Sequence, residues 1–293
     1  MKKIISKKKL FIIIAVVLMV LTLSSCTVPT DPVTNEPIYI SLDTTFKDMQ
    51  DLKSGLFDVF LTYPLAQAIN FASSKVGVFG GIAIVTLLLN VVLLVFTFKS
   101  NVSMQKMQMI QPELEKIQKK YEGQESQAAK MQMSQEMQRL FDKNGVNPLA
   151  SFASFLQLPI FLCMYAAIRR SYAVAHGTFL GASLALTPRE AFAGKEIVLI
   201  IIYFCMIIFQ LISTLFPQMI ANAKKKRQAQ IQHKPYEKTK NSNAFMMYGL
   251  VVVIGFAMLS WPTALSLYYA IVSLVNILKT IVVEAIMQKK GVN

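Results

Sequence analysis

The chain has 293 residues, of which 54% are hydrophobic and 16% charged, and its formal net charge at pH 7 is +14. This balance excludes a soluble domain with one large core and predicts a multi-spanning, all-α membrane protein. The positive charge lies in segments between apolar runs, as in cytoplasmic loops of membrane proteins, so we expect no DNA partner. Cys163 and Cys205 fall within apolar runs, where cysteine is expected to act as a small hydrophobe, and no metal site is predicted.

The N-terminus has the pattern of a secretory signal. Residues 1–25 contain a basic start and then an apolar run, which predicts a signal peptide rather than a permanent span. The run ends in Leu23-Ser24-Ser25-Cys26, which resembles a bacterial lipoprotein cleavage box. Cys26 is therefore predicted to become the lipidated N-terminus; in the alternative, this cysteine is incidental. Residues 26–55 lack periodicity and are expected to form an extracytoplasmic tether.

An interfacial helix and the first span are predicted next. Residues 56–78 place Phe71 on one side and Asp58 and Asn70 on the other, which indicates an amphipathic helix on the outer membrane surface. Residues 79–100 form an apolar helix long enough to cross a hydrocarbon core of about 30 Å.

Residues 101–147 are polar, rich in methionine and crossed by two apolar seams. The seams step at helical spacing through Met107, Ile110, Leu114, Ile117 and Tyr121, and through Ala129, Met133, Met137 and Leu140. We expect two antiparallel helices packed into a cytoplasmic hairpin, with Pro112 as the point of re-entry into helix and Asn144-Gly145 as the stop. Met104, Met109 and Met131 lie off the seams. Because methionine is flexible and polarisable, these three are better candidates than the seam methionines for contact with partners.

The remaining chain is predicted to contain four further spans. They lie at 148–170, 196–217, 244–260 and 262–286, with an outer loop at 171–195, a basic loop at 218–243 and a cytoplasmic tail at 287–293. Pro159 is expected to kink the second span and Pro217 to end the third.

Charge indicates the orientation of these spans. The 101–147 and 218–243 segments each carry seven Lys and Arg, against three in residues 27–79. Both basic segments are therefore expected in the cytoplasm and the N-terminus outside. Arg169 and Arg170, at the outer face, run against the rule but do not reverse it.

Polar side chains recur at helical spacing in four of the five spans. They are Thr86, Asn90, Gln157, Gln210, Ser213, Thr214, Ser266, Tyr269, Ser273 and Asn276. One such stripe is more often a hydrogen-bonding contact between helices. Four exceed what packing requires, because lipid-facing surface has to stay apolar, so we expect a shared polar groove. Lys279, near the inner end of the last span, is expected to snorkel or to reach this groove.

No enzyme chemistry and no cofactor are predicted. The spans contain no Asp and no paired carboxylates, and the chain has no Gly-x-Ser-x-Gly motif. Two functions other than catalysis are considered for a chain with a polar groove. A small-solute transporter or channel is one, but it would be expected to show inverted repeats, which the sequence lacks. A scaffold for assembly of membrane proteins is the other.

Three stretches resemble the YidC–Oxa–Alb family of membrane protein insertases. They are MQKMQMIQPELEKIQKKY after the first span, NPLASFASFLQLPIFLCMY, and FAMLSWPTALSLYYAIVSLVNILK. The likeness runs from about Leu56 to Ile286, and the lipoprotein-type start without a large outer domain is similar to the Gram-positive form. The resemblance implies a chaperone and insertase of the bacterial plasma membrane, with a groove open to cytoplasm and lipid and a hairpin that recruits substrates.

The resemblance also implies partners and one departure from the family pattern. The implied partners are nascent membrane proteins, membrane lipids, the ribosome and the Sec translocon. The Gram-positive form typically carries an Arg in the first span where this chain has Asn90, so attraction of acidic substrate tails is expected to be weaker here. Tyr269 stands where relatives often have Trp.

Overall fold

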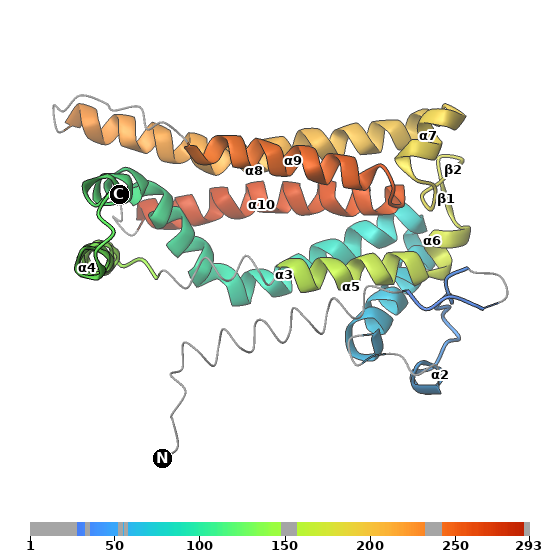
Figure 1. Cartoon of the computed structure of the whole chain (residues 1–293). Helices are drawn as coiled ribbons and strands as arrows, with labels where there is room; N and C mark the ends of the chain where they lie inside the picture. The colour runs from blue at the N-terminus through green and yellow to red at the C-terminus, as the bar shows by residue number, and fades with distance from the viewer. Residues whose placement is uncertain are drawn as a thin grey trace, which may run out of the picture. The chain divides into compact units, whose positions relative to one another are not determined.

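The computed structural model describes residues 28–32, 36–51, 55, 58–147, 157–231 and 242–289. Within them the chain is mostly helical, which confirms the predicted all-α membrane fold (Figure 1). The elements are α2 (Phe46–Asp51), the π-helix η1 (Asp58–Thr62), α3 (Tyr63–Lys120), α4 (Gln127–Lys143), α5 (Gln157–Arg170), α6 (Tyr172–His176), β1 (Thr178–Phe179), β2 (Ala182–Ser183), α7 (Pro188–Gly194), α8 (Ile197–Ile231), α9 (Ser242–Met258) and α10 (Thr263–Lys289). The predicted signal peptide and Cys26 lie outside the described residues.

Three described helical stretches are long and apolar enough to cross a membrane. They are Asp58–Val95, Ile197–Ile231 and Thr263–Met287, and they overlap the first, third and last predicted spans. The second predicted span is described only from Gln157 onward, as α5. Helix α9 has 17 residues, about 25 Å of helix, which is short for a span.

The chain divides into two compact units. Unit 1 comprises Met1–Leu88, Phe155–Phe204 and Phe256–Tyr269, and unit 2 comprises Leu89–Ser154, Cys205–Gly255 and Ala270–Asn293. Helices α3, α8, α9 and α10 each contribute residues to both units.

Helix α3 joins three predicted segments. It includes most of the interfacial helix, the first span and the first arm of the hairpin, and its backbone leaves helical geometry at Gly77 (φ 78°, ψ 166°). Glycine tolerates this positive φ because it has no Cβ. The predicted re-entry into helix at Pro112 is wrong, because Pro112 lies inside α3. A proline removes one i→i−4 hydrogen bond, and the long helix on both sides of it outweighs that loss.

Helix α8 also runs past its predicted end. Pro217 lies within α8, which continues to Ile231. The basic run that begins at Lys224 is therefore helical in its first part, and the predicted boundary at residue 217 marks a change of composition rather than the end of a helix.

Part of the predicted tether is packed against the rest of unit 1. The Ile40 N–H donates to the Arg170 carbonyl at 2.6 Å, and the Tyr172 N–H donates to the Ile40 carbonyl at 3.0 Å. Ile40 and Met49 are fully buried. Burial of these two apolar side chains stabilises the packed conformation of the segment, although the segment has no apolar periodicity in sequence.

Small elements build the predicted outer loop (Figure 1). Helix α6 is followed by the antiparallel β1–β2 hairpin and by α7. Helix α7 begins with a capping box, in which the Thr187 hydroxyl accepts from the Glu190 N–H and the Glu190 carboxylate accepts from the Thr187 N–H. Hydrogen bonds from the backbone and side chain of Thr187 hold the pKa of Glu190 below its ordinary value.

In unit 2 the two predicted hairpin seams meet. Ile110 and Leu114 from α3 are buried with Leu140 from α4 and Val146. Ser126 caps the start of α4, and its side-chain oxygen accepts from the Ala129 N–H. The helix ends before Asn144-Gly145, as predicted, and Gly145 has a φ of 58°.

Candidate functional site

Unit 2 brings a lysine and an asparagine together within the predicted spans. Asn90 on α3 is only 2% exposed. Its Oδ1 accepts a hydrogen bond of 3.1 Å from Nζ of Lys279 on α10. In the described part of the chain, Lys279 forms no ion pair with a carboxylate. A positive charge therefore lies beside Asn90, and it comes from the last span rather than the first.

A second polar pair joins α8 and α10 in unit 2. The Ser273 hydroxyl, on a fully buried residue, donates to Oε1 of Gln210 at 2.6 Å. The Thr214 hydroxyl donates within its own helix, to the Gln210 carbonyl. Ser213 is half-buried and Asn276 is exposed. Gln210 and Ser273 thus form a hydrogen-bonding contact between helices, which is the other interpretation that the sequence allowed for a polar stripe.

The other predicted groove residues belong to unit 1. Thr86 is fully buried, and its hydroxyl donates to the Ile82 carbonyl one turn earlier at 2.7 Å. Ser266 is fully buried and its hydroxyl has no hydrogen-bond partner among the described residues. The Tyr269 ring lies 5.3 Å from the Phe161 ring, in an aromatic cluster. The side chain of Gln157 lies outside the described part of the structure.

Unit 1 also contains a buried polar cluster that was not predicted from the sequence. Arg170, which is fully buried, lies 3.4 Å from the Asp58 carboxylate, measured from its Nη1 atom, and its Nε donates to the Ile38 carbonyl. Nearby, the Asn70 side chain accepts from the Ser171 hydroxyl at 2.6 Å and donates to the Ile40 carbonyl at the same distance. The signal was present, because Arg170 violates the positive-inside pattern and a charge at that position needs a partner.

The polar face of the predicted interfacial helix is therefore buried in protein. Asp58, Thr62 and Asn70 are each at most 6% exposed, whereas Phe60 and Phe71 are more than 60% exposed. The amphipathic pattern is real, and the polar side contacts the neighbouring chain segments of unit 1.

A third polar pair lies at the Lys279 end of α10 in unit 2. Lys224 on α8 forms an ion pair of 2.8 Å with Glu284 on α10, and both side chains are less than one-fifth exposed. The Gln105 amide of α3 donates to the Thr280 carbonyl of α10 at 3.2 Å. These contacts connect the base of the hairpin to α8 and α10.

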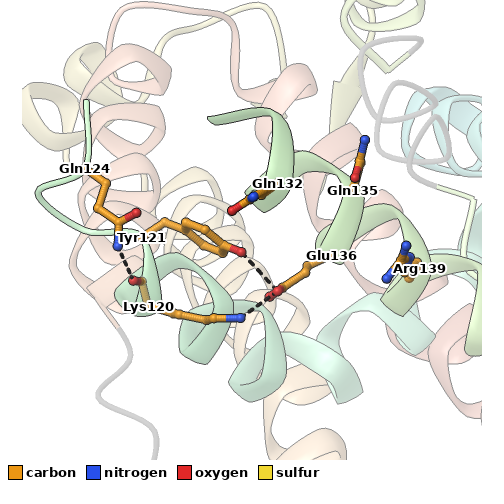
Figure 2. Close-up of a pocket in the computed structure, with 7 residues that line it drawn as sticks. All are labelled: Lys120, Tyr121, Gln124, Gln132, Gln135, Glu136 and Arg139. Atoms are coloured by element: carbon orange, nitrogen blue, oxygen red, sulfur yellow. Dashed lines mark hydrogen bonds and ion pairs between the residues drawn. The ribbon is translucent and has the colours of Figure 1, made fainter. Parts of the chain in front are cut away.

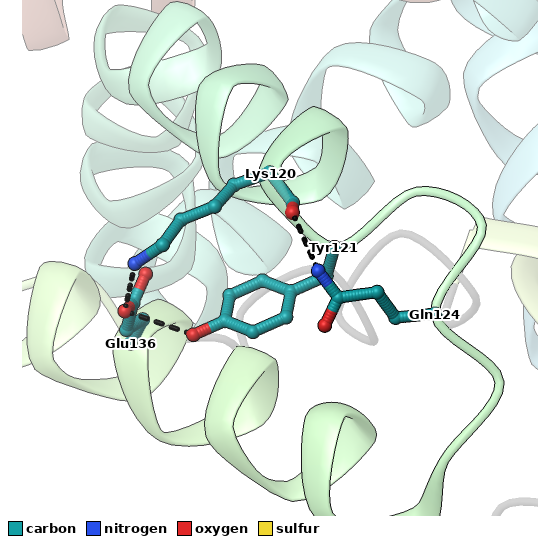
Figure 3. Close-up of polar contacts among 4 residues, drawn as sticks. All are labelled: Lys120, Tyr121, Gln124 and Glu136. Atoms are coloured by element: carbon teal, nitrogen blue, oxygen red, sulfur yellow. Dashed lines mark hydrogen bonds and ion pairs between the residues drawn. The ribbon is translucent and has the colours of Figure 1, made fainter.

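The hairpin tip contains a polar pocket with a volume of about 490 Å³. Figure 2 shows its lining residues, which are Lys120, Tyr121, Gln124, Gln132, Gln135, Glu136 and Arg139. Figure 3 shows that the Glu136 carboxylate accepts two hydrogen bonds, from Lys120 Nζ at 2.6 Å and from the Tyr121 hydroxyl at 3.0 Å. The Lys120 hydrogen bond, followed by that of Tyr121, holds the pKa of Glu136 below its ordinary value, and the same contact raises the pKa of Lys120.

The three methionines predicted to recruit substrates have different environments. Met131 on α4 is 60% exposed. Met104 and Met109 on α3 are half-buried, and Met109 lines a small cavity with Pro217 and Glu284. Met131 is thus the most accessible of the three. No cluster of three or more His, Cys, Asp or Glu side chains suited to a metal ion occurs among the described residues.

Comparison with known proteins identifies the family. Residues 70–290 match the family model described as "60Kd inner membrane protein". The chain is 30% identical over 292 residues to "Membrane protein insertase YidC" of Oceanobacillus iheyensis, covering 97% of this chain and 99% of that protein. It is 28% identical over 268 residues to "Membrane protein insertase YidC 2" of Bacillus anthracis, covering 90% and 89%.

A third relative extends the same pattern. "Membrane protein insertase MisCA" of Bacillus subtilis is 29% identical over 238 residues, which cover 80% of this chain and 82% of that protein. The family match includes most of α3 and all of the hairpin, α8 and α10. Helices α3, α8 and α10 carry the polar pairs of unit 2. The chain therefore belongs to the 60Kd inner membrane protein family, the YidC–Oxa–Alb group, and is a multi-pass membrane protein.

Proposed function

We propose that this protein is a membrane insertase and chaperone, which accepts nascent membrane proteins through a polar groove open to cytoplasm and lipid. The observation that carries the proposal is the Lys279–Asn90 pair. A lysine ammonium within a span is costly to keep, and its partner here is a neutral amide rather than a carboxylate. Such an ammonium retains most of its capacity to bind an incoming anionic or polar group.

The mechanism follows from exchange of hydrogen bonds. The polar flank of a nascent segment enters from the cytoplasm and replaces Asn90 as the acceptor for Lys279. Gln210, Ser213 and Asn276 are further groups in the same unit that can exchange partners with it. The apolar part of the segment meanwhile enters lipid, which stabilises it by about 25 cal/mol per Å² of buried apolar surface. No nucleotide is required for this step.

We further propose that Cys26 is lipidated after removal of residues 1–25, and that the N-terminus lies outside the cell. Met131 at the hairpin is the favoured first contact for substrates, since it is apolar, flexible and exposed. The ribosome and the Sec translocon are further proposed partners.

An insertion assay tests the proposal. The full chain is reconstituted into liposomes with a single-span substrate that carries a short acidic tail, and a photocrosslinker replaces Asn276 on α10. The matched control replaces Leu278, which is 60% exposed and lies about 200° around the helix from Asn276. We expect insertion, with crosslinks from position 276 to the acidic tail and from position 278 mainly to lipid.

The possible failures separate the alternatives. Insertion no better than in empty liposomes would overturn the insertase function and favour an assembly scaffold, for which the Gln210–Ser273 contact is structural glue. Solute flux without insertion would favour a transporter. Insertion with equal tail crosslinking from both positions would retain the function and overturn the groove.

A further inference from the structure

The turn between β1 and β2 places a leucine where the backbone disfavours it. Leu180 and Gly181 connect the two strands, and their φ angles are 52° and 85°. Two-residue turns with positive φ at both positions favour Asn-Gly or Gly-Gly, because most side chains clash with their own backbone there. The leucine at the first position is therefore strained, and a strained position of this kind points to a role for the side chain.

Burial of the Leu180 side chain in the core does not offset that strain. The Leu180 side chain is 76% exposed, the largest exposed fraction of any large apolar side chain that the structure describes. Its hairpin neighbours Phe179 and Ala182 are half-buried and buried. The turn thus presents one apolar side chain outward from an otherwise packed hairpin.

Two contacts hold this hairpin beside the end of the first span. The Phe179 ring stacks on the Phe79 ring with a centroid separation of 4.4 Å. The backbone of Gly177 approaches Val78 so closely that a Cβ at Gly177 would overlap the valine. Val78 and Phe79 begin the apolar part of α3 directly after Gly77. Leu180 is therefore held near the level at which α3 enters the hydrocarbon.

We propose that Leu180 inserts into the bilayer, so that the β1–β2 hairpin anchors the outer segment of unit 1 to the leaflet beside the outer end of the first span. This anchor goes beyond the proposed insertase function. One leucine at a turn buries far less than the roughly 800 Å² per partner that a stable protein interface needs. Acyl chains require no complementary surface, and Phe71 and Val76, in the turns of α3 before Gly77, are also exposed and apolar.

Depth-dependent quenching tests the anchor. Leu180→Cys is introduced into the full chain carrying Cys26→Ala, Cys163→Ala and Cys205→Ala, so that it holds a single thiol. This variant is labelled with bimane and reconstituted into phosphatidylglycerol vesicles containing lipid spin-labelled near the headgroup. The matched control is Lys195→Cys, because Lys195 belongs to the same outer segment, is exposed and also has a positive φ of 57°.

For insertion to about 5–10 Å, we expect lipid quenching at position 180 to be at least about twofold stronger than at position 195, with the order reversed for aqueous iodide. Equal lipid quenching at the two positions, or stronger iodide quenching at position 180, would overturn the proposal. Protection from both quenchers would also overturn it and would indicate that protein covers the turn.

A second variant covers the case in which labelling disturbs the hairpin. The chain contains one tryptophan, so Leu180→Trp combined with Trp261→Phe gives a single fluorophore at the turn. We expect blue-shifted emission that brominated lipid quenches, and emission typical of water without such quenching would refute the anchor. Neither measurement depends on insertion activity.

Discussion

Replacing Asn90 and Lys279 singly and together tests the pair on which the proposed mechanism depends. Asn90→Leu removes the 3.1 Å acceptor and leaves the ammonium of Lys279 without it inside the span. A hydrogen bond to a charged group contributes about 1.5–3 kcal/mol, and most of that is lost when one partner is removed. Replacing both partners by leucine removes the isolated charge, so the double variant is expected to be more stable than the sum of the single losses predicts.

The expected magnitudes follow from the same geometry. We expect a coupling free energy of about 1.5–3 kcal/mol from the double-mutant cycle of the wild-type chain, the two single leucine variants and the double variant. Asn90→Arg is expected to be more damaging, because two cations about 4 Å apart repel by about 4 kcal/mol at an effective dielectric constant of 20. Combining Asn90→Arg with Lys279→Leu moves the charge to the first span and is expected to restore stability and insertion of acidic-tailed substrates.

The assay is unfolding by sodium dodecyl sulfate titration in mixed micelles, with insertion measured on the same preparations. Lys289→Leu serves as the control, since it removes an exposed charge from the same helix and should change stability by less than about 0.5 kcal/mol. A coupling energy below about 0.5 kcal/mol would refute the reasoning, because it would mean that Asn90 and Lys279 do not depend on each other.

Three further predictions concern other contacts. Arg170→Met leaves the Asp58 carboxylate buried without its cation and is expected to lower the unfolding free energy by about 3–5 kcal/mol, whereas adding Asp58→Leu should recover most of it; equal losses would contradict this. Because the pKa of Glu136 is lowered, its contact with Lys120 stabilises the hairpin above the ordinary glutamate pKa and is lost as the pH falls through the lowered value; Lys120→Ala should raise the pKa of Glu136 in a carbon-13 NMR titration, and an unchanged value would disprove the link. Gly177→Ala forces a methyl group against the Val78 side chain and the Ala173 carbonyl oxygen and should cost about 1–3 kcal/mol in the same detergent titration, so an unaffected transition would show that these approaches are looser than described.

Local periodicity predicted the hairpin well. The seams that contain Ile110 and Leu140 come from residues three and four apart, and each helix buries one such face against the other. The stop at Asn144-Gly145 is equally local, because it depends on one residue with positive φ. Prolines were poor predictors of helix ends. Pro112 and Pro217 resemble helix boundaries in sequence, but long helices continue through both.

The polar pairs could not be predicted, because they depend on residues far apart in the chain. Lys279 and Asn90 are 189 positions apart, and the sequence indicated only that each was an unusual residue for a span. Arg170 appeared as an exception to the charge rule, and its partner Asp58 appeared as part of a water-facing stripe. The burial of Arg170 is explained by Asp58 and that of Asp58 by Arg170, since a buried charge is tolerated only with a partner.

The continuity of α3 has a mechanical consequence. From Asn90 to Lys120 the helix is unbroken over 31 residues, about 45 Å. A helix of this length is stiff and bends only gently, except where a proline weakens it. A force applied at the hairpin tip is therefore transmitted along α3 to Asn90, and the helix bends most easily at Pro112. Binding at the hairpin is thus mechanically connected, through one continuous helix, to the residue that accepts the hydrogen bond of Lys279.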